Sequence, residues 1–201
     1  IHNKNSKFLR FVFFLRYLFV IFLISTTLFL LIPIFFNYEK KAELIINRIF
    51  NNYDLKIKDY EKINFKPLPI PKIEFKDVSI NLDKTNIEMK VKNLEIVPKI
   101  FSIYNEKNFQ IKKIILKDNQ IDIDASLLKV FITKFANIKN KYFFDNLNLK
   151  IFDEDISLTK IERIKYANYG YNKYIITGKI FEKKFKSEIK DNFKDINFNL
   201  S

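Results

Sequence analysis

The sequence predicts an α+β protein that is rich in β-structure. We expect a single N-terminal transmembrane helix, followed by a curved, mostly antiparallel, amphipathic β-sheet with a few short helices. Three observations support this: an uncharged apolar run from Tyr17 to Tyr38, an apolar/polar alternation of period two that starts at Leu55, and one-residue slips that recur in that alternation.

The apolar run is long enough for a membrane anchor, because as a helix it spans roughly 33 Å. We therefore expect a basic tail over 1–16, an anchor over 17–38 and one β-rich domain over 39–201. A cleaved signal peptide is the alternative, but bulky residues continue to Phe36 and no A-x-A pattern follows. The positive-inside rule places the tail in the cytosol, since the residues before the run are basic and not acidic: Lys4, Lys7, Arg10 and Arg16.

The amino-acid composition limits the kinds of partner that the protein can bind. The chain has 201 residues, a formal net charge of +13 and no cysteine, so disulfides and thiolate metal sites are excluded. The lysines are spread along alternating strand positions and accompany many Asn, Ile, Phe and Tyr residues, which A/T-rich codons encode. We therefore expect no nucleic-acid partner, whereas a basic surface near anionic lipid headgroups fits this charge.

Helices are expected in three places. Apolar residues recur at helical spacing over 39–53, and Pro98 opens a short turn over 99–104. A third helix is predicted over 125–139, with Asp124 as its N-cap.

The remaining segments read as strands. Strands are predicted near Leu55, before Pro67, and through 73–82, 87–96 and 109–123, with a turn at Asp118-Asn119. Pro67, Pro69 and Pro71 predict an extended connection or a sheet edge. Later strands are predicted over 143–152, 156–166, 173–181 and 185–189, with a hairpin turn over 153–155.

The alternation slips by one residue at three places, which is how a β-bulge appears in a sequence. The slips fall at Lys76-Asp77, between Val91 and Leu94, and between Ile111 and Ile114. Repeated bulges would bend the sheet into a curved wall.

Nearly every strand has one apolar and one polar face, so something must cover the apolar side. Ordinary packing against a second layer is one interpretation, and a groove for lipid acyl chains is the other. The groove interpretation takes these residues as its lining: Ile73, Phe75, Val78, Ile80, Met89, Val91, Leu94, Ile96, Ile111 and Ile114.

Catalytic chemistry finds little support. The one histidine, His2, precedes the anchor, so Ser-His and His-metal arrangements in the main domain are excluded. Asp118, Asp122 and Asp124 fit a turn, a solvated face and a helix cap better than a Ca²⁺ site. We expect no enzyme activity, no metal and no cofactor.

The order of elements from Ala42 to Ile123 resembles the N-terminal region of the AsmA family of bacterial envelope proteins. The segments that carry the resemblance are Ile46–Ile49, Leu55–Ile57, Pro69–Ile80, Val91–Ile103, Ile111–Leu116 and Ile121–Ile123. The usual small-residue turn after the first helix is replaced by Asn52-Tyr53-Asp54. The glycine that often follows the short helix is missing from Asn105-Glu106-Lys107.

The resemblance implies a protein of the bacterial inner membrane with its main domain in the periplasm. It implies a role in outer-membrane biogenesis through binding or transfer of phospholipids along the β-groove. Family members are generally longer, so we expect the domain to be truncated at its C-terminus. The alternatives are a structural module that docks an envelope protein partner, and a short β-jelly-roll shuttle for lipopolysaccharide.

Overall fold

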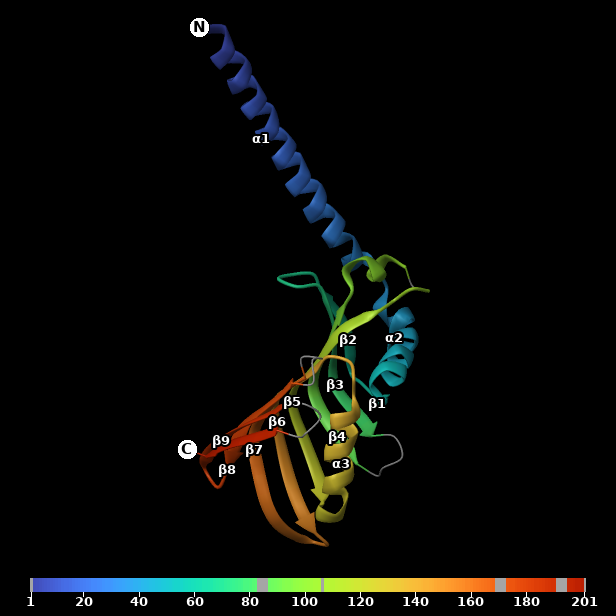
Figure 1. The fold of residues 1–201 in the computed structure, drawn as a ribbon. Helices are drawn as coiled ribbons and strands as arrows, with labels where there is room; N and C mark the ends of the chain where they lie inside the picture. The colour runs from blue at the N-terminus through green and yellow to red at the C-terminus, as the bar shows by residue number, and fades with distance from the viewer. Residues whose placement is uncertain (1, 83–86, 106, 169–172, 191–194, 201) are drawn as a thin grey trace. The chain divides into compact units, whose positions relative to one another are not determined.

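The computed structural model describes residues 2–82, 87–105, 107–168, 173–190 and 195–200. The chain divides into two compact units, Ile1–Phe36 and Asn37–Ser201. In the first unit, helix α1 (His2–Leu31) runs into a 3₁₀ helix, η1 (Ile32–Phe35) (Figure 1). The segment Phe8–Phe35 is long and apolar enough to cross a membrane, a property that N-terminal signal sequences share.

The second unit is built on one open sheet of ten strands (Figure 1). Nine strands follow the order β1-β3-β4-β5-β6-β7-β8-β9-β10, and β2 pairs with β3 beside β1. The predicted β-rich α+β class is thus confirmed. The strands are β1 (Leu55–Asp59), β2 (Lys62–Lys66), β3 (Lys72–Leu82), β4 (Glu88–Pro98), β5 (Ile111–Asp124), β6 (Tyr142–Asp153), β7 (Ile156–Asn168), β8 (Lys173–Ile180), β9 (Lys183–Lys190) and β10 (Asp195–Leu200).

Strand pairing is antiparallel except between β5 and β6, which run parallel. Parallel neighbours need a crossover connection. Here η3 (Ala125–Leu127) and α3 (Leu128–Asn137) supply it. The mostly antiparallel sheet is as predicted, and the one parallel pair brings α3 across the sheet.

Helix α2 (Tyr38–Tyr53) matches the helix predicted over 39–53. The Asn37 side chain accepts a hydrogen bond from the Lys40 backbone N–H at 3.1 Å, and Asp54 closes the other end in the left-handed region. Its apolar side, which includes Ile45 and Ile49, is buried, and the helix lies against β1 and β2. A further 3₁₀ helix, η2 (Ile100–Tyr104), follows Pro98 as predicted.

Four residues with left-handed backbone form a row across the sheet, and we call it the left-handed row. It keeps the apolar side chains of the strands on one face of the sheet. Asp77 in β3, Asp118 in β5, Asn146 in β6 and Arg163 in β7 have φ between 48° and 63°. Strand register aligns Asp77, through Lys92 of β4, with Asp118 and Asn146. A left-handed residue turns the strand by one position, so that Phe75 and Val78 are both buried although three positions separate them.

Two of the three predicted slips are found in the burial patterns of β3 and β4. The third, between Ile111 and Ile114, coincides with a shift in the register between β4 and β5. The predicted turn at Asp118-Asn119 is wrong, because both residues lie within the continuous strand β5. Asp and Asn tolerate left-handed backbone, and they therefore favour this row as readily as a turn.

Among the described residues, the polar face of the sheet contains two buried carboxylates, Glu74 and Glu95. Glu74 of β3 pairs with Lys66 Nζ at 2.7 Å. Glu95 of β4 accepts hydrogen bonds from Lys72 Nζ at 2.7 Å and from Lys117 Nζ at 2.9 Å. Burial alone would raise the pKa of Glu95, but the two ammonium groups outweigh it and the pKa is lowered. The hydrogen bond to Glu95 in turn raises the pKa of Lys117.

Replacing Asp118 by Val should destabilise the domain by about 1–2 kcal/mol, because a β-branched residue is strained in left-handed backbone. It also removes the 2.7 Å hydrogen bond that Asn146 Nδ2 donates to Asp118 Oδ1. Urea unfolding measures the effect. The control is Asp122→Val, an exposed site in the same strand, which should change stability by less than about 0.5 kcal/mol. Equal effects of the two changes would contradict the role given to the row.

Replacing Glu95 by Gln should lower the free energy of unfolding at pH 7 by about 1–2 kcal/mol. A lowered pKa stabilises the fold above the unfolded-state value of about 4.3 and loses that effect as the pH falls through the folded-state pKa. The difference between wild type and variant should therefore shrink as the pH falls below about 4.3 and vanish below the folded-state pKa of Glu95. Glu43→Gln, at an exposed position of α2, is the control and should show no such pH dependence. A loss that stays constant with pH would argue against ion pairing.

Candidate functional site

The residues predicted to line a groove lie inside the protein. Ile111 is half-buried, and the other nine are exposed by 2% or less. Neighbouring strands flank them at both sides, and α2 lies against the β1–β2 end of the sheet. In this structure they are core residues, so a surface open to a ligand must be sought elsewhere. The buried nine are Ile73, Phe75, Val78, Ile80, Met89, Val91, Leu94, Ile96 and Ile114.

The proposed anchor flank lies on α1. This helix contains Lys4, Lys7, Arg10 and Arg16, so the described part of the basic tail, residues 2–16, forms one helix with the apolar segment. Arg10 and Arg16 are exposed, and the side chains of Lys4 and Lys7 lie outside those that the structure describes.

The open part of the apolar face lies over the later strands, where α3 crosses. Asp124 caps the start of this crossover, as predicted, and accepts a hydrogen bond from the Ser126 backbone N–H at 2.8 Å. Phe131 and Phe135 turn towards the sheet, and the Phe135 ring packs edge-on against Phe144 at 4.9 Å between centroids. These rings hold α3 against β6.

The C-terminal end of α3 is fixed by polar contacts. The Tyr142 hydroxyl donates to the Phe135 carbonyl at 2.5 Å, and Asn168 Nδ2 donates to the Ile138 carbonyl at 2.8 Å. Lys134 on α3 also pairs with Asp54 after α2 at 3.0 Å. Between α3 and strands β6–β9 a cavity remains.

We call this space the α3 cavity. Its volume is about 270 Å³, slightly below the range of about 300–1,000 Å³ for small-molecule sites. It suits part of one hydrocarbon chain better than a whole lipid. Its lining is Leu128, Phe131, Ile132, Phe135, Ala136, Phe144, Leu147, Leu149, Ile161, Ile164, Tyr166, Ile176 and Phe185.

The lining offers no charged group. The Tyr166 hydroxyl is its one polar side-chain group, and burial raises the pKa of Tyr166 well above that of an exposed tyrosine. The hydroxyl therefore stays neutral at physiological pH. An apolar, uncharged site attracts ligands through the hydrophobic effect, at about 0.8 kcal/mol for each methylene that it buries.

Apolar side chains continue outside the cavity. Ile132 lines it and is 54% exposed, and Val130 on the same helix is 43% exposed. Ile156 and Leu158 at the start of β7 are 69% and 52% exposed. A ligand that protruded from the cavity would still find apolar surface on this side of the unit.

The sequence predicts the groove over the half of the apolar face that is covered in this structure. The helix predicted over 125–139 and the strands predicted over 156–166 and 173–181 all contribute residues to the α3 cavity. The number of predicted helices could have indicated this open region. The one helix that packs over β6–β9 is α3, and its ten residues are too few to cover four strands.

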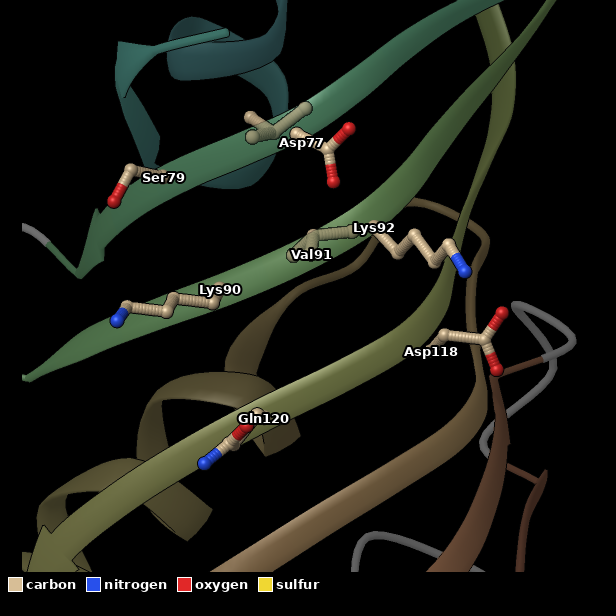
Figure 2. Close-up of a pocket in the computed structure, with 8 residues that line it drawn as sticks. Asp77, Ser79, Lys90, Val91, Lys92, Asp118 and Gln120 are labelled. Atoms are coloured by element: carbon tan, nitrogen blue, oxygen red, sulfur yellow. The ribbon is translucent and has the colours of Figure 1, made fainter. Parts of the chain in front are cut away.

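A second hollow lies at the left-handed row, on the polar side of β3, β4 and β5. Figure 2 shows Asp77, Lys92 and Asp118 at one level, and Ser79, Lys90 and Gln120 at the next. The hollow has a volume of about 380 Å³. Its charges alternate in sign, as on a solvated sheet face, and this pattern does not define a ligand.

Among the described residues, no group of three or more His, Asp or Glu side chains is placed to hold a metal ion. Comparison of the chain with family models, with curated proteins and with solved structures finds no match. The geometry of the α3 cavity is therefore the basis for a functional proposal.

Replacing Gly178 by Ala tests how the cavity wall is packed. An added Cβ would lie 2.8 Å from the Phe185 ring, so the ring must move, and we expect a loss of about 1 kcal/mol by thermal unfolding. In a Phe185→Ala background the nearest remaining atom is the Glu162 carbonyl at 3.4 Å. There the same change should stabilise the domain by about 0.5 kcal/mol, because alanine restricts the unfolded chain. The same sign in both backgrounds would contradict this packing.

Proposed function

We propose that this chain is a membrane-anchored, AsmA-like protein of the bacterial inner membrane that binds phospholipid acyl chains. In this proposal it contributes to outer-membrane biogenesis by binding or transferring phospholipids, without enzyme activity. The observation that carries the proposal is the α3 cavity, whose lining is hydrocarbon except for one neutral hydroxyl. An acyl chain is a ligand that needs no polar partner in its site.

Two further features support the proposal. The Phe8–Phe35 segment has the length and composition of a membrane span, and the basic residues of α1 precede its most apolar part. The positive-inside rule then leaves the N-terminus in the cytoplasm and the β-domain on the periplasmic side. The β-domain would thereby be held beside a source of phospholipid.

The site differs from the groove that the sequence predicted. In this proposal, α3 and strands β6–β9 form the lipid-facing surface, whereas β3, β4 and the N-terminal part of β5 form the core. The size of the cavity limits the ligand to a portion of one acyl chain, with the rest of the lipid outside.

A docking surface for an envelope protein is the second candidate. Two pairs of exposed apolar residues favour it, Val130 and Ile132 on α3 and Ile156 and Leu158 on β7, because exposed apolar surface is typical of protein interfaces. In that case the cavity would be filled by a partner side chain.

Ala136→Leu tests the acyl-chain proposal, because leucine fills the cavity and is a good helix former. The full chain is reconstituted in nanodiscs with a phospholipid that carries a photoactivatable diazirine near the end of its acyl chain. Crosslinking to peptides of α3 and β7–β9, measured by mass spectrometry, should fall at least about fivefold, because the filled cavity excludes the chain.

Thr133→Leu is the matched control, because Thr133 is exposed and does not line the cavity. It should leave crosslinking unchanged. Crosslinks confined to α1 in the wild type, or equal labelling of wild type and Ala136→Leu, would reject acyl-chain binding in the cavity.

A further inference from the structure

The face of β7–β9 opposite the α3 cavity has a different chemistry. A hollow of about 350 Å³ on these strands is lined by five basic residues and by no acidic residue. We call these five the basic patch: Arg163, Lys165, Lys179, Lys184 and Lys186. Inner residues such as Ile176 alternate with them along the strands, so the patch and the cavity lie on opposite faces of the same sheet.

Nearby carboxylates neutralise this face only in part. Lys165 pairs with Asp145 at 3.0 Å, and Lys186 lies 3.7 Å from Glu188. Glu162 pairs with the adjacent Lys160 at 2.6 Å. With Lys160 included, basic residues still outnumber these three carboxylates by three.

We propose that the basic patch binds the phosphate headgroups of an anionic bilayer surface. Several cations presented side by side at strand spacing suit a surface of many phosphates better than one deeply bound ligand. Each basic residue near an anionic bilayer contributes about 1 kcal/mol, so a few of them suffice for reversible association. Strands β7, β8 and β9 lie five to seven positions after β1 in the sheet order, about 24–34 Å across the sheet from the edge strand β1.

This inference concerns a second surface and does not depend on the α3 cavity. It takes its setting from the proposed membrane anchor, because an anchored domain meets lipid surfaces at high effective concentration. The same setting favours a bilayer over a nucleic acid, which the basic charge alone would also attract.

The test uses the full chain in nanodiscs made only of zwitterionic lipid. These are mixed with separate liposomes that contain either no anionic lipid or about one third phosphatidylglycerol. Flotation then measures capture of the nanodiscs by the liposomes. We expect capture by anionic liposomes only, and its loss in 1 M salt, where the Debye length falls to about 3 Å.

The patch variant is Lys179→Gln, Lys184→Gln and Lys186→Gln combined, and it should reduce capture at least about tenfold. The control variant removes the same charge from exposed positions of β1, β2 and β4, with Lys56→Gln, Lys62→Gln and Lys90→Gln combined. The control should change capture by less than about twofold, because those residues lie outside the patch. Circular dichroism checks that both variants are folded.

Three outcomes would overturn the inference: equal capture by neutral liposomes, equal loss in both variants, or tighter binding to a DNA duplex than to anionic liposomes at the same salt. The cavity variant Ala136→Leu separates the two proposals, since it should leave capture intact while it reduces acyl crosslinking. If the chain does not enter nanodiscs, the proposed membrane anchor is wrong. The inference that the basic patch binds a bilayer beside that anchor would then be wrong as well.

Discussion

The left-handed row at Asp77, Asp118, Asn146 and Arg163 is the constraint on which the rest of the sheet depends. A strand of eleven to fourteen residues without such a row would follow a strict period of two, and the residues after the slip would point their apolar side chains into water. Because neighbouring strands slip at the same level, register is kept across β3, β4, β5 and β6. The result is one continuous apolar face and one polar face on long, bent strands.

A continuous apolar face has to be covered, and the two helices cover it unequally. Helix α2 has sixteen residues and packs against the edge formed by β1 and β2. Helix α3 has ten residues, and it enters because β5 and β6 are parallel and need a crossover. Its rings contact β6, and the space above β7–β9 stays open. The α3 cavity is therefore a consequence of topology as much as of residue type.

The two faces of β7–β9 have different chemistries. Hydrocarbon lines the inner side, and lysine and arginine side chains extend from the outer side. On the polar face, the carboxylate of Glu95 is buried, and two lysine ammonium groups at hydrogen-bonding distance compensate its charge. A sheet of this kind keeps charge and hydrocarbon apart by the alternation of single residues along each strand.

The sequence by itself determined the local features. Four features depend only on neighbouring residues, and the sequence therefore predicts them. They are the uncharged run after Arg16, the helical spacing over 39–53, the cap at Asp124 and the slip of the alternation at Asp77. Tertiary structure decided whether a given apolar face is core or surface, because that depends on which distant segment covers it. Nothing local distinguishes Phe75, buried in the sheet, from Ile161, which lines a cavity. The environments of Phe75 and Ile161 differ because of the parallel pairing of β5 with β6. This pairing directs α3 across β6 and leaves the later strands partly uncovered.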